Sequence, residues 1–468
     1  MAEIRWPLEP DAAALEALTA ACARFAIDHV LSLPRQPASD VADAFALAAS
    51  FREPPPETGQ EIAAILARLA PAVAKSFNSA GPGYLAYIPG GGLYAAALAD
   101  FIACAVNRYV GMEQAAPALA RIEMSVIDWL AGLMGYPVGA RGILTSGGSL
   151  SNFSAVTTAR AAKLPEDFLA GTIYASSETH HSLLKAARLA GFPRGSVRVL
   201  PVDERLRLSP AALDEAVRAD RSRGLHPFLV VANVGTTNTG AVDPLRDVLE
   251  VARRHDLWVH GDAAYGGFFR LAPGGEALMP GIEECDSITL DPHKGFFLPY
   301  GTGCLLVRDG EALRRAHQET AEYLQDVQLR EGAANFADFS PELSRDFRGL
   351  RIWLPVQLHG LSAFRDQLAE KLALTRFAYD ELRSDSLFEM LDEPQLSIVA
   401  FRLRGPAAEA DVKGAELMRR VNAGGRVFLS STRIGGRHAL RICVLSFRTH
   451  RDRVQEAVAA LRAEARAL

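Results

Sequence analysis

The chain has 468 residues, of which 49% are hydrophobic and 22% charged, and these values exclude a disordered, collagen-like or coiled-coil protein. Its 50 basic and 55 acidic residues give a formal net charge of −5, which argues against nucleic acid or a membrane surface as a partner. A single core stops growing near roughly 250–300 residues, so we expect two or three domains.

The N-terminus and the cysteines predict the compartment. Residues 1–7 lack the basic start and apolar run of a signal peptide. The most apolar stretch, residues 93–106, is interrupted by Asp100 and is shorter than the ~20 residues that a membrane-spanning helix needs. The five cysteines are scattered without a C-x-x-C pair, which disfavours disulfides and a zinc site. We expect a soluble, cytoplasmic protein without a bound metal.

The first part of the chain is helical in pattern. Residues 11 to about 75 are rich in Ala and Leu at helical spacing, with proline-rich interruptions at 33–34 and 54–56. Helices with so much apolar surface need something to cover them. We therefore predict an N-terminal helical arm, residues 1–85, that packs on another domain or subunit.

Strands and helices alternate from about residue 90. Strands are predicted at 142–145, 197–200, 228–232 and 257–260. Helices are predicted at 150–160 and after Ser209 and Asp243, because each of these residues precedes a proline suited to the first helical turn. This alternation predicts an α/β domain, residues 86–365, with a mostly parallel sheet covered on both faces.

The last part of the chain is predicted to form a smaller α+β domain, residues 366–468. Its expected elements are a helix at 365–384, strands near 397–403 and 440–445, and a final helix from residue 451.

Two charged residues, Lys294 and Asp262, follow apolar strands at positions where they could take part in catalysis. Lys294 follows an apolar strand, residues 288–290, and a deprotonated lysine in a desolvated pocket can form a Schiff base. Asp262 ends another apolar run, 32 residues earlier. Taken alone, the lysine is better read as a loop residue beside a turn proline, and the aspartate as a turn cap.

Two further segments suggest ligand contacts. Thr145-Ser-Gly-Gly148-Ser149-Leu-Ser-Asn opens a helix directly after a strand, an arrangement that attracts a phosphate. The one match to the dinucleotide-binding pattern, residues 81–86, does not open a helix and lacks the required context. His180 and His181 are a surface pair, a helix cap, or an imidazole that stacks on a cofactor ring; a metal pair is disfavoured.

Together and in this order, these segments resemble the group II pyridoxal-phosphate-dependent amino-acid decarboxylases, the family of aromatic-L-amino-acid and glutamate decarboxylases. Three more segments carry the resemblance: residues 83–89 (a substrate-pocket loop), 123–129 (E-x-x-x-x-D-W) and 346–353. It implies a fold-type-I enzyme, similar to aspartate aminotransferase, that uses pyridoxal 5'-phosphate. It also implies a homodimer with the active site at the interface.

The resemblance assigns cofactor contacts residue by residue. Lys294 would bind the cofactor covalently, Asp262 would pair with the pyridine nitrogen, and His180 would stack on the ring; these three are the predicted catalytic residues. The other implied cofactor contacts are Gly148, Ser149 and His293 at the phosphate, Ala264 on the second ring face and Thr236 near the ring oxygen.

The implied substrate contacts are Tyr87, Pro89, Phe336 and Arg441. Arg441 would bind the substrate carboxylate, or instead form a salt bridge within the C-terminal domain. The loop at 87–89 suggests an aromatic or apolar substrate. Nothing clearly supplies a second cation for an acidic one, although Arg108 or Arg348 could.

Two positions depart from the family pattern. Asp291 replaces the usual Asn, and an ionised Asp cannot donate a hydrogen bond to the phosphate. Phe336 falls, by an ungapped count, where decarboxylases carry a catalytic tyrosine that resembles a general acid. Either Tyr323 or His181 takes that role, or the count is misplaced, or the reaction differs.

The sequence thus predicts the decarboxylation of an L-amino acid to an amine and CO2. The alternative from Phe336 is an oxygen-dependent reaction that yields an aldehyde, ammonia and peroxide. A third possibility is a non-enzymatic relative that uses the fold as a binding module.

Overall fold

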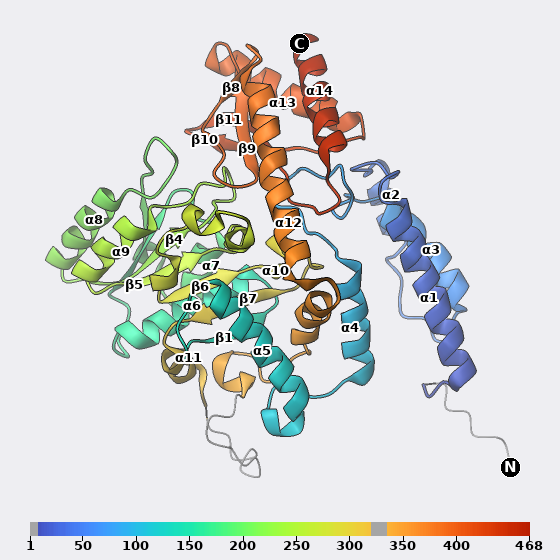
Figure 1. The fold of residues 1–468 in the computed structure, drawn as a ribbon, viewed down its shortest axis with the longest axis horizontal. Helices are drawn as coiled ribbons and strands as arrows, with labels where there is room; N and C mark the ends of the chain where they lie inside the picture. Colours follow the sequence, from blue (N-terminus) through green and yellow to red (C-terminus); the bar gives the residue numbers. More distant parts are fainter. Residues whose placement is uncertain (1–7, 320–334) are drawn as a thin grey trace.

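The computed structural model describes residues 8–319 and 335–468, and three helices near the N-terminus stand beside the rest of the chain (Figure 1). They are α1 (Ala12–Ser32), α2 (Ala44–Ala49) and α3 (Ile62–Ala74). None of the three contains a buried residue, and their leucines and isoleucines remain largely exposed. The helical content predicted for residues 11–75 is confirmed.

A seven-stranded sheet forms the centre of the molecule, with the strand order β1-β7-β6-β5-β4-β2-β3. Its strands are β1 (Arg141–Thr145), β2 (Gly171–Ser176), β3 (Val197–Leu200), β4 (His226–Asn233), β5 (Trp258–Asp262), β6 (Ser287–Leu290) and β7 (Gly303–Val307). All neighbours pair in parallel except β7, which is antiparallel to β6 and β1. The predicted mostly parallel sheet is confirmed.

Two further helices precede β1, others lie between the strands, and one follows β7. They are α4 (Tyr94–Val106), α5 (Pro117–Leu133), α6 (Gly148–Lys163), α7 (Ser182–Leu189), α8 (Pro210–Ser222), α9 (Leu245–Arg254), α10 (Pro292–Gly295) and α11 (Gly310–His317). Of these, α5, α6, α8, α9, α10 and α11 pack against the sheet. Helix α8 begins as predicted, because the Ser209 side chain accepts a hydrogen bond from the amide of Ala212. Asp243 does not cap α9 in this way; its carboxylate accepts from the amides of Leu208 and Asn233.

A long helix, α12 (Gly349–Arg383), joins the large sheet to a smaller antiparallel sheet (Figure 1). It kinks at Gly360, whose φ of 70° suits glycine, and it includes most of the helix predicted at 365–384. The remaining elements are β8 (Phe388–Met390), β9 (Ile398–Leu403), α13 (Ala407–Ala423), β10 (Ser430–Ile434), β11 (Arg437–Cys443) and α14 (Arg451–Arg466). The small sheet has the order β10-β11-β9-β8.

Each sheet has its own apolar core, and a hydrogen bond between side chains links them. The hydroxyl of Tyr265, a residue of the large sheet's core, lies 2.6 Å from Oγ of Ser397, which directly precedes β9. Helix α12 continues through the predicted boundary at residue 365, so the division into three domains stays a prediction.

Within residues 8–319 and 335–468, no helix combines the length and the apolar character that a membrane crossing requires. In the same part of the chain, no three His, Cys, Asp or Glu side chains are grouped as metal ligands. All five cysteines are free thiols.

Candidate active site

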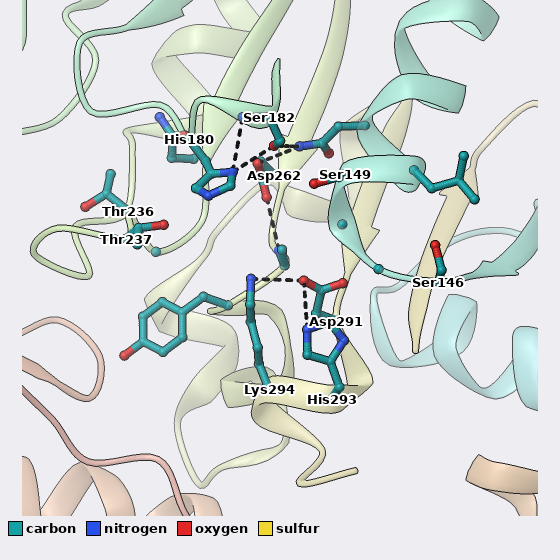
Figure 2. A pocket seen from close by; sticks show the side chains of 18 residues that line it. Ser146, Ser149, His180, Ser182, Thr236, Thr237, Asp262, Asp291, His293 and Lys294 are labelled. Atoms are coloured by element: carbon teal, nitrogen blue, oxygen red, sulfur yellow. Dashed lines mark hydrogen bonds and ion pairs between the residues drawn. The ribbon is translucent and has the colours of Figure 1, made fainter. Parts of the chain in front are cut away.

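A cavity of about 280 Å³ lies at the carboxyl ends of the parallel strands (Figure 2). Asn233 ends β4, Asp262 ends β5, and Asp291 directly follows β6. Open α/β sheets bind ligands at this edge. The fold therefore brings together segments that lie more than a hundred residues apart in the sequence.

The glycine-rich turn after β1 forms one end of this cavity. Gly147 has a φ of 153°, which other residues rarely adopt, and a Cβ on Gly148 would approach Oδ2 of Asp291 to 3.0 Å. Gly148 and Ser149 open α6, so their amides have no acceptor within the helix. The turn thus offers free amides at a helix N-terminus, an arrangement suited to an anion.

Asp262, also on the cavity wall, is held by Asn152 from the first turns of α6. The Nδ2 atom of Asn152 donates to Oδ2 of Asp262 at 3.0 Å and to Oγ of Ser182 at 3.0 Å. The Oδ1 atom of Asn152 accepts from Oγ1 of Thr289 at 2.8 Å, and Nε2 of His260 lies 3.1 Å away. Every polar atom of this amide is therefore bonded.

His180 lines the cavity beside Asp262. Its Nδ1 accepts from the amide of Ser182 at 3.3 Å and lies 2.8 Å from the Ser182 hydroxyl. Burial is the largest effect on the pKa of His180 and lowers it, although the charge of Asp262 acts in the opposite direction. The imidazole is therefore neutral near pH 7.

Lys294 reaches into the cavity from α10 and pairs with Asp291 (Figure 2). Its Nζ lies 2.9 Å from Oδ2 of Asp291, and Nε2 of His293 lies 3.7 Å from the same oxygen. Burial lowers the pKa of Lys294, but the Asp291 carboxylate outweighs it and holds the pKa above the ordinary value. Asp291 therefore keeps the amine charged in the protein alone, and the neutral amine expected for Schiff-base formation stays a prediction.

Two smaller residues complete the predicted cofactor set. Ala264 lines the cavity, and its amide donates to Oδ1 of Asp262 at 3.3 Å. Thr236 also lines it, but its hydroxyl accepts from the amide of Ala241 and lies 2.9 Å from that of Thr239. The eight predicted cofactor residues all lie on the cavity wall.

Arg441 lies outside that wall. Its Nε donates to the carbonyl of Asn238 at 2.8 Å, and its Nη1 donates to Oγ of Ser430 at 2.9 Å. Its Nη2 donates to the carbonyls of Tyr87 (3.2 Å) and Thr237. Four of its five N–H groups are therefore used to hold loops together, and its contact with a substrate carboxylate stays a prediction.

The segment at 87–92 packs closely against neighbouring residues. Tyr87 has a φ of 51° and is 53% exposed, whereas Pro89 is buried, and neither lines the cavity. A Cβ on Gly90 would come within 2.9 Å of the Tyr300 ring, and one on Gly91 within 2.3 Å of the Phe297 carbonyl. These glycines allow close packing.

Phe336 is buried in the main core and is 1% exposed. It opens a short 3-10 helix (Phe336–Phe339), and Cζ of Arg345 lies 5.1 Å from its ring centre. The ring does not line the cavity of its own chain. Tyr323, the alternative proton donor, lies outside the described residues, while His181 stands beside His180 with their ring centres 4.2 Å apart.

Residues 49–404 match the pyridoxal-dependent decarboxylase conserved domain. The chain belongs to this decarboxylase family. An aromatic-L-amino-acid decarboxylase of Bacillus atrophaeus is 34% identical over 429 residues, which cover 90% of this chain and 89% of the relative. Tryptophan decarboxylase 1 of Oryza sativa subsp. japonica is 34% identical over 393 residues, covering 78% of this chain and 76% of the relative.

Solved structures agree with this assignment. The structure of Oryza sativa TDC with PLP and tryptamine matches with a TM-score of 0.93 and 29% identity, over 99% of each chain. That of Catharanthus roseus tryptophan decarboxylase in complex with L-tryptophan matches with a TM-score of 0.91 and 25% identity, over 99% of this chain and 100% of the other. The predicted family, fold type I and enzyme class are confirmed.

The decarboxylase uses pyridoxal 5'-phosphate, and the cavity fits this group. The free amides at Gly148 and Ser149 suit a phosphate, Asp262 offers a fixed carboxylate to a ring nitrogen, and Lys294 is the amine within the cavity. Oδ1 of Asp291 is buried without a hydrogen-bond partner among the described residues, as expected of a wall that a ligand completes.

Sequence reasoning missed Asn152, Ser182 and Tyr265, which also line the cavity. One signal was available for Asn152. It lies three residues after Ser149 and four after Gly148, so all three share one helix face. No local pattern marks Ser182 as a partner of that face, because their contact depends on how α6 and α7 pack.

Proposed function

We propose that this decarboxylase converts an aromatic L-amino acid to its amine and CO2. The observation that carries the proposal is the single cavity that joins Lys294, Asp262 and His180 to the glycine turn at Gly148. The similar aromatic and tryptophan decarboxylases support the aromatic substrate. Arg348, a candidate cation for an acidic substrate, is already paired with Glu342 at 2.6 Å and Asp346 at 2.8 Å.

The chain's own residues hold the cofactor and control its protons. Lys294 would hold it covalently through Nζ, which in the protein alone pairs with Oδ2 of Asp291 at 2.9 Å. Ser149 and Gly148 would bind the phosphate through their amides, with His293 beside them. Asp262, fixed by Asn152, would stabilise a proton on the ring nitrogen. Bound pyridoxal phosphate supplies the ring that accepts the electron pair left by CO2.

The remaining predicted residues shape the substrate side. Ala264 and His180, which line the cavity, would enclose the ring, and Thr236 would lie near the ring oxygen. Arg441 fixes the loops at Tyr87 and Thr237, of which Thr237 lines the cavity, and its fifth N–H is left for a substrate carboxylate.

Phe336 favours a second candidate, the oxygen-dependent formation of an aldehyde. Phenylalanine cannot donate the proton that completes an amine. Phe336 is buried, and its side chain has no hydroxyl that could act as an acid at this position of the fold.

One experiment separates the two reactions and identifies the substrate. Each standard amino acid is incubated with the cofactor-loaded enzyme, and amine, aldehyde, peroxide and oxygen uptake are recorded with and without oxygen. We expect amine from aromatic substrates at equal rates in both conditions. Aldehyde and peroxide that require oxygen would support the second candidate, and release of amine from glutamate alone would contradict the aromatic substrate.

A homodimer is the proposed assembly. Helix α4 exposes Leu98, Phe101, Ile102 and Val106, and α1 and α3 contact one another while leaving their outer leucines uncovered. A second copy would bury these faces and bring the interface to the cavity. Sedimentation should give twice the chain mass of 50.4 kDa, and a monomer at micromolar concentration would contradict the proposal. The five free thiols agree with the predicted cytoplasmic location.

A further inference from the structure

A directed chain of hydrogen bonds connects Asp262 to His180. An ionised carboxylate only accepts hydrogen bonds, so the atom of Asn152 that faces Asp262 at 3.0 Å must be the Nδ2 donor. This fixes the orientation of the amide. Its second N–H then points to Oγ of Ser182, also at 3.0 Å, and that oxygen acts as an acceptor.

The direction continues from Ser182 to the imidazole. Because Oγ accepts from Asn152, its own hydrogen is available to Nδ1 of His180 at 2.8 Å. The amide of Ser182 donates to the same nitrogen at 3.3 Å. Two donors facing Nδ1 leave no place for a proton there, so the ring proton is on Nε2. Figure 2 shows this second nitrogen on the side of the ring away from Ser182.

The hydrogen bonds of the amide oxygen support the same orientation of the Asn152 side chain. Oδ1 of Asn152 accepts from Thr289, so Nε2 of His260 at 3.1 Å is also a donor. His260 then accepts at Nδ1 from the hydroxyl of Ser287, 2.8 Å away. Ser287 in turn accepts from Nε1 of Trp258 at 2.8 Å. The indole can only donate, so both ends of the network impose the same direction.

We propose that Asn152 and Ser182 are positioning residues, which hold His180 as a neutral imidazole with its Nε2–H directed into the cavity. The imidazole then acts toward the bound group as a hydrogen-bond donor rather than as a base. The charged and titratable groups that face this ring are Asp262, His181, Lys294 and Asp291. Their charges act on the affinity for a proton, whereas the two donors determine which nitrogen carries it.

The test is a nitrogen-15 NMR titration of the full chain without cofactor, with labelled histidine, from pH 5 to 8.5. His180→Gln identifies the resonances of His180 among the 11 histidines. We expect a neutral ring, protonated at Nε2, and an apparent pKa below 6.5. A protonated Nδ1 in the neutral wild-type ring would overturn the proposal, and this measurement requires no folded variant.

Variants then test the two positioning residues. Ser182→Ala removes one donor to Nδ1, and in Asn152→Ala the Ser182 hydroxyl is no longer constrained to donate to that nitrogen. In both variants the pKa of His180 should therefore rise by about half to one unit, the effect of one net hydrogen bond. Ser182→Thr should restore the wild-type value. Ser154→Ala, a buried serine on α6 outside the cavity, is the matched control and should change nothing.

Equal pKa values in the wild type and both alanine variants would overturn the role of Asn152 and Ser182. The inference deepens the proposed function, but the titration does not depend on it. Failure of the protein to bind pyridoxal phosphate would remove the proposed function and leave the imidazole orientation standing.

Discussion

The two sides of the cavity differ in how completely their polar groups are paired. On the side of Asp262 and His180, Asn152 uses all of its hydrogen-bonding capacity. On the side of Lys294, Asp291 has one buried oxygen without a partner among the described residues, and its other oxygen holds an amine that must move when the cofactor binds. One side is preorganised, and the other is completed by the ligand.

Removing the Lys294 amine should abolish the function of the ligand-completed side. In Lys294→Ala, turnover should fall by about 10³-fold or more, on the scale of losing a catalytic acid–base group. The Schiff-base absorbance should also be absent when pyridoxal phosphate is added. Lys75→Ala is the control, because Lys75 forms a similar pair with Asp40 at 3.0 Å in the N-terminal arm. Persistence of the absorbance in Lys294→Ala would contradict the assignment.

Neutralising the Asp262 carboxylate should impair the function of the preorganised side. Asp262→Asn keeps the shape but no longer stabilises a proton on the ring nitrogen, so we expect kcat to fall by about 10²-fold while the cofactor remains bound. Asp286→Asn is a matched control at the opposite end of the sheet, where this carboxylate accepts from the amide of Val259. An unchanged kcat in Asp262→Asn would show that this acid does not act on the ring.

Replacing Asp291, the acid beside Lys294, should change the rate of cofactor attachment rather than the rate of catalysis. Asp291 is what holds the pKa of Lys294 above its ordinary value, so burial should lower that pKa in Asp291→Asn. Each unit by which it falls gives about tenfold more neutral amine. At pH 7 the covalent attachment of pyridoxal phosphate, followed by absorbance, should therefore be faster. Slower attachment would mean that Asp291 serves mainly as a proton acceptor.

The smallest of these expected effects is on acid stability, and it comes from His260 on the preorganised side. Burial lowers the pKa of His260 to about 4, whereas the unfolded chain has the ordinary value near 6.5. Between these values the unfolded state binds the extra proton, so the free energy of unfolding falls as the pH falls from 6.5 to 4. Urea unfolding should show a weaker pH dependence in His260→Gln. An identical slope would indicate that His260 is already charged in the fold.

The same contrast explains what the sequence could reveal. Lys294, Asp262 and the glycine turn stand at strand ends, where short patterns predict both the element and the chemistry. The position of Arg441 in sequence suggested a substrate contact, but its bonds to the loops at Tyr87 and Thr237 depend on how the two sheets meet. Phe336 was found by counting, and counting does not reveal that its ring packs into the core. The link from Asn152 to His180 joins two helices, so it appears only in three dimensions.

The most direct test of the proposed site is to locate the covalent bond. The enzyme is incubated with pyridoxal 5'-phosphate, reduced with borohydride and digested, and the modified peptide is identified by mass spectrometry. The proposed site predicts a phosphopyridoxyl group on Lys294 in stoichiometric amount. Modification of another lysine, or none with the protein folded, would contradict it.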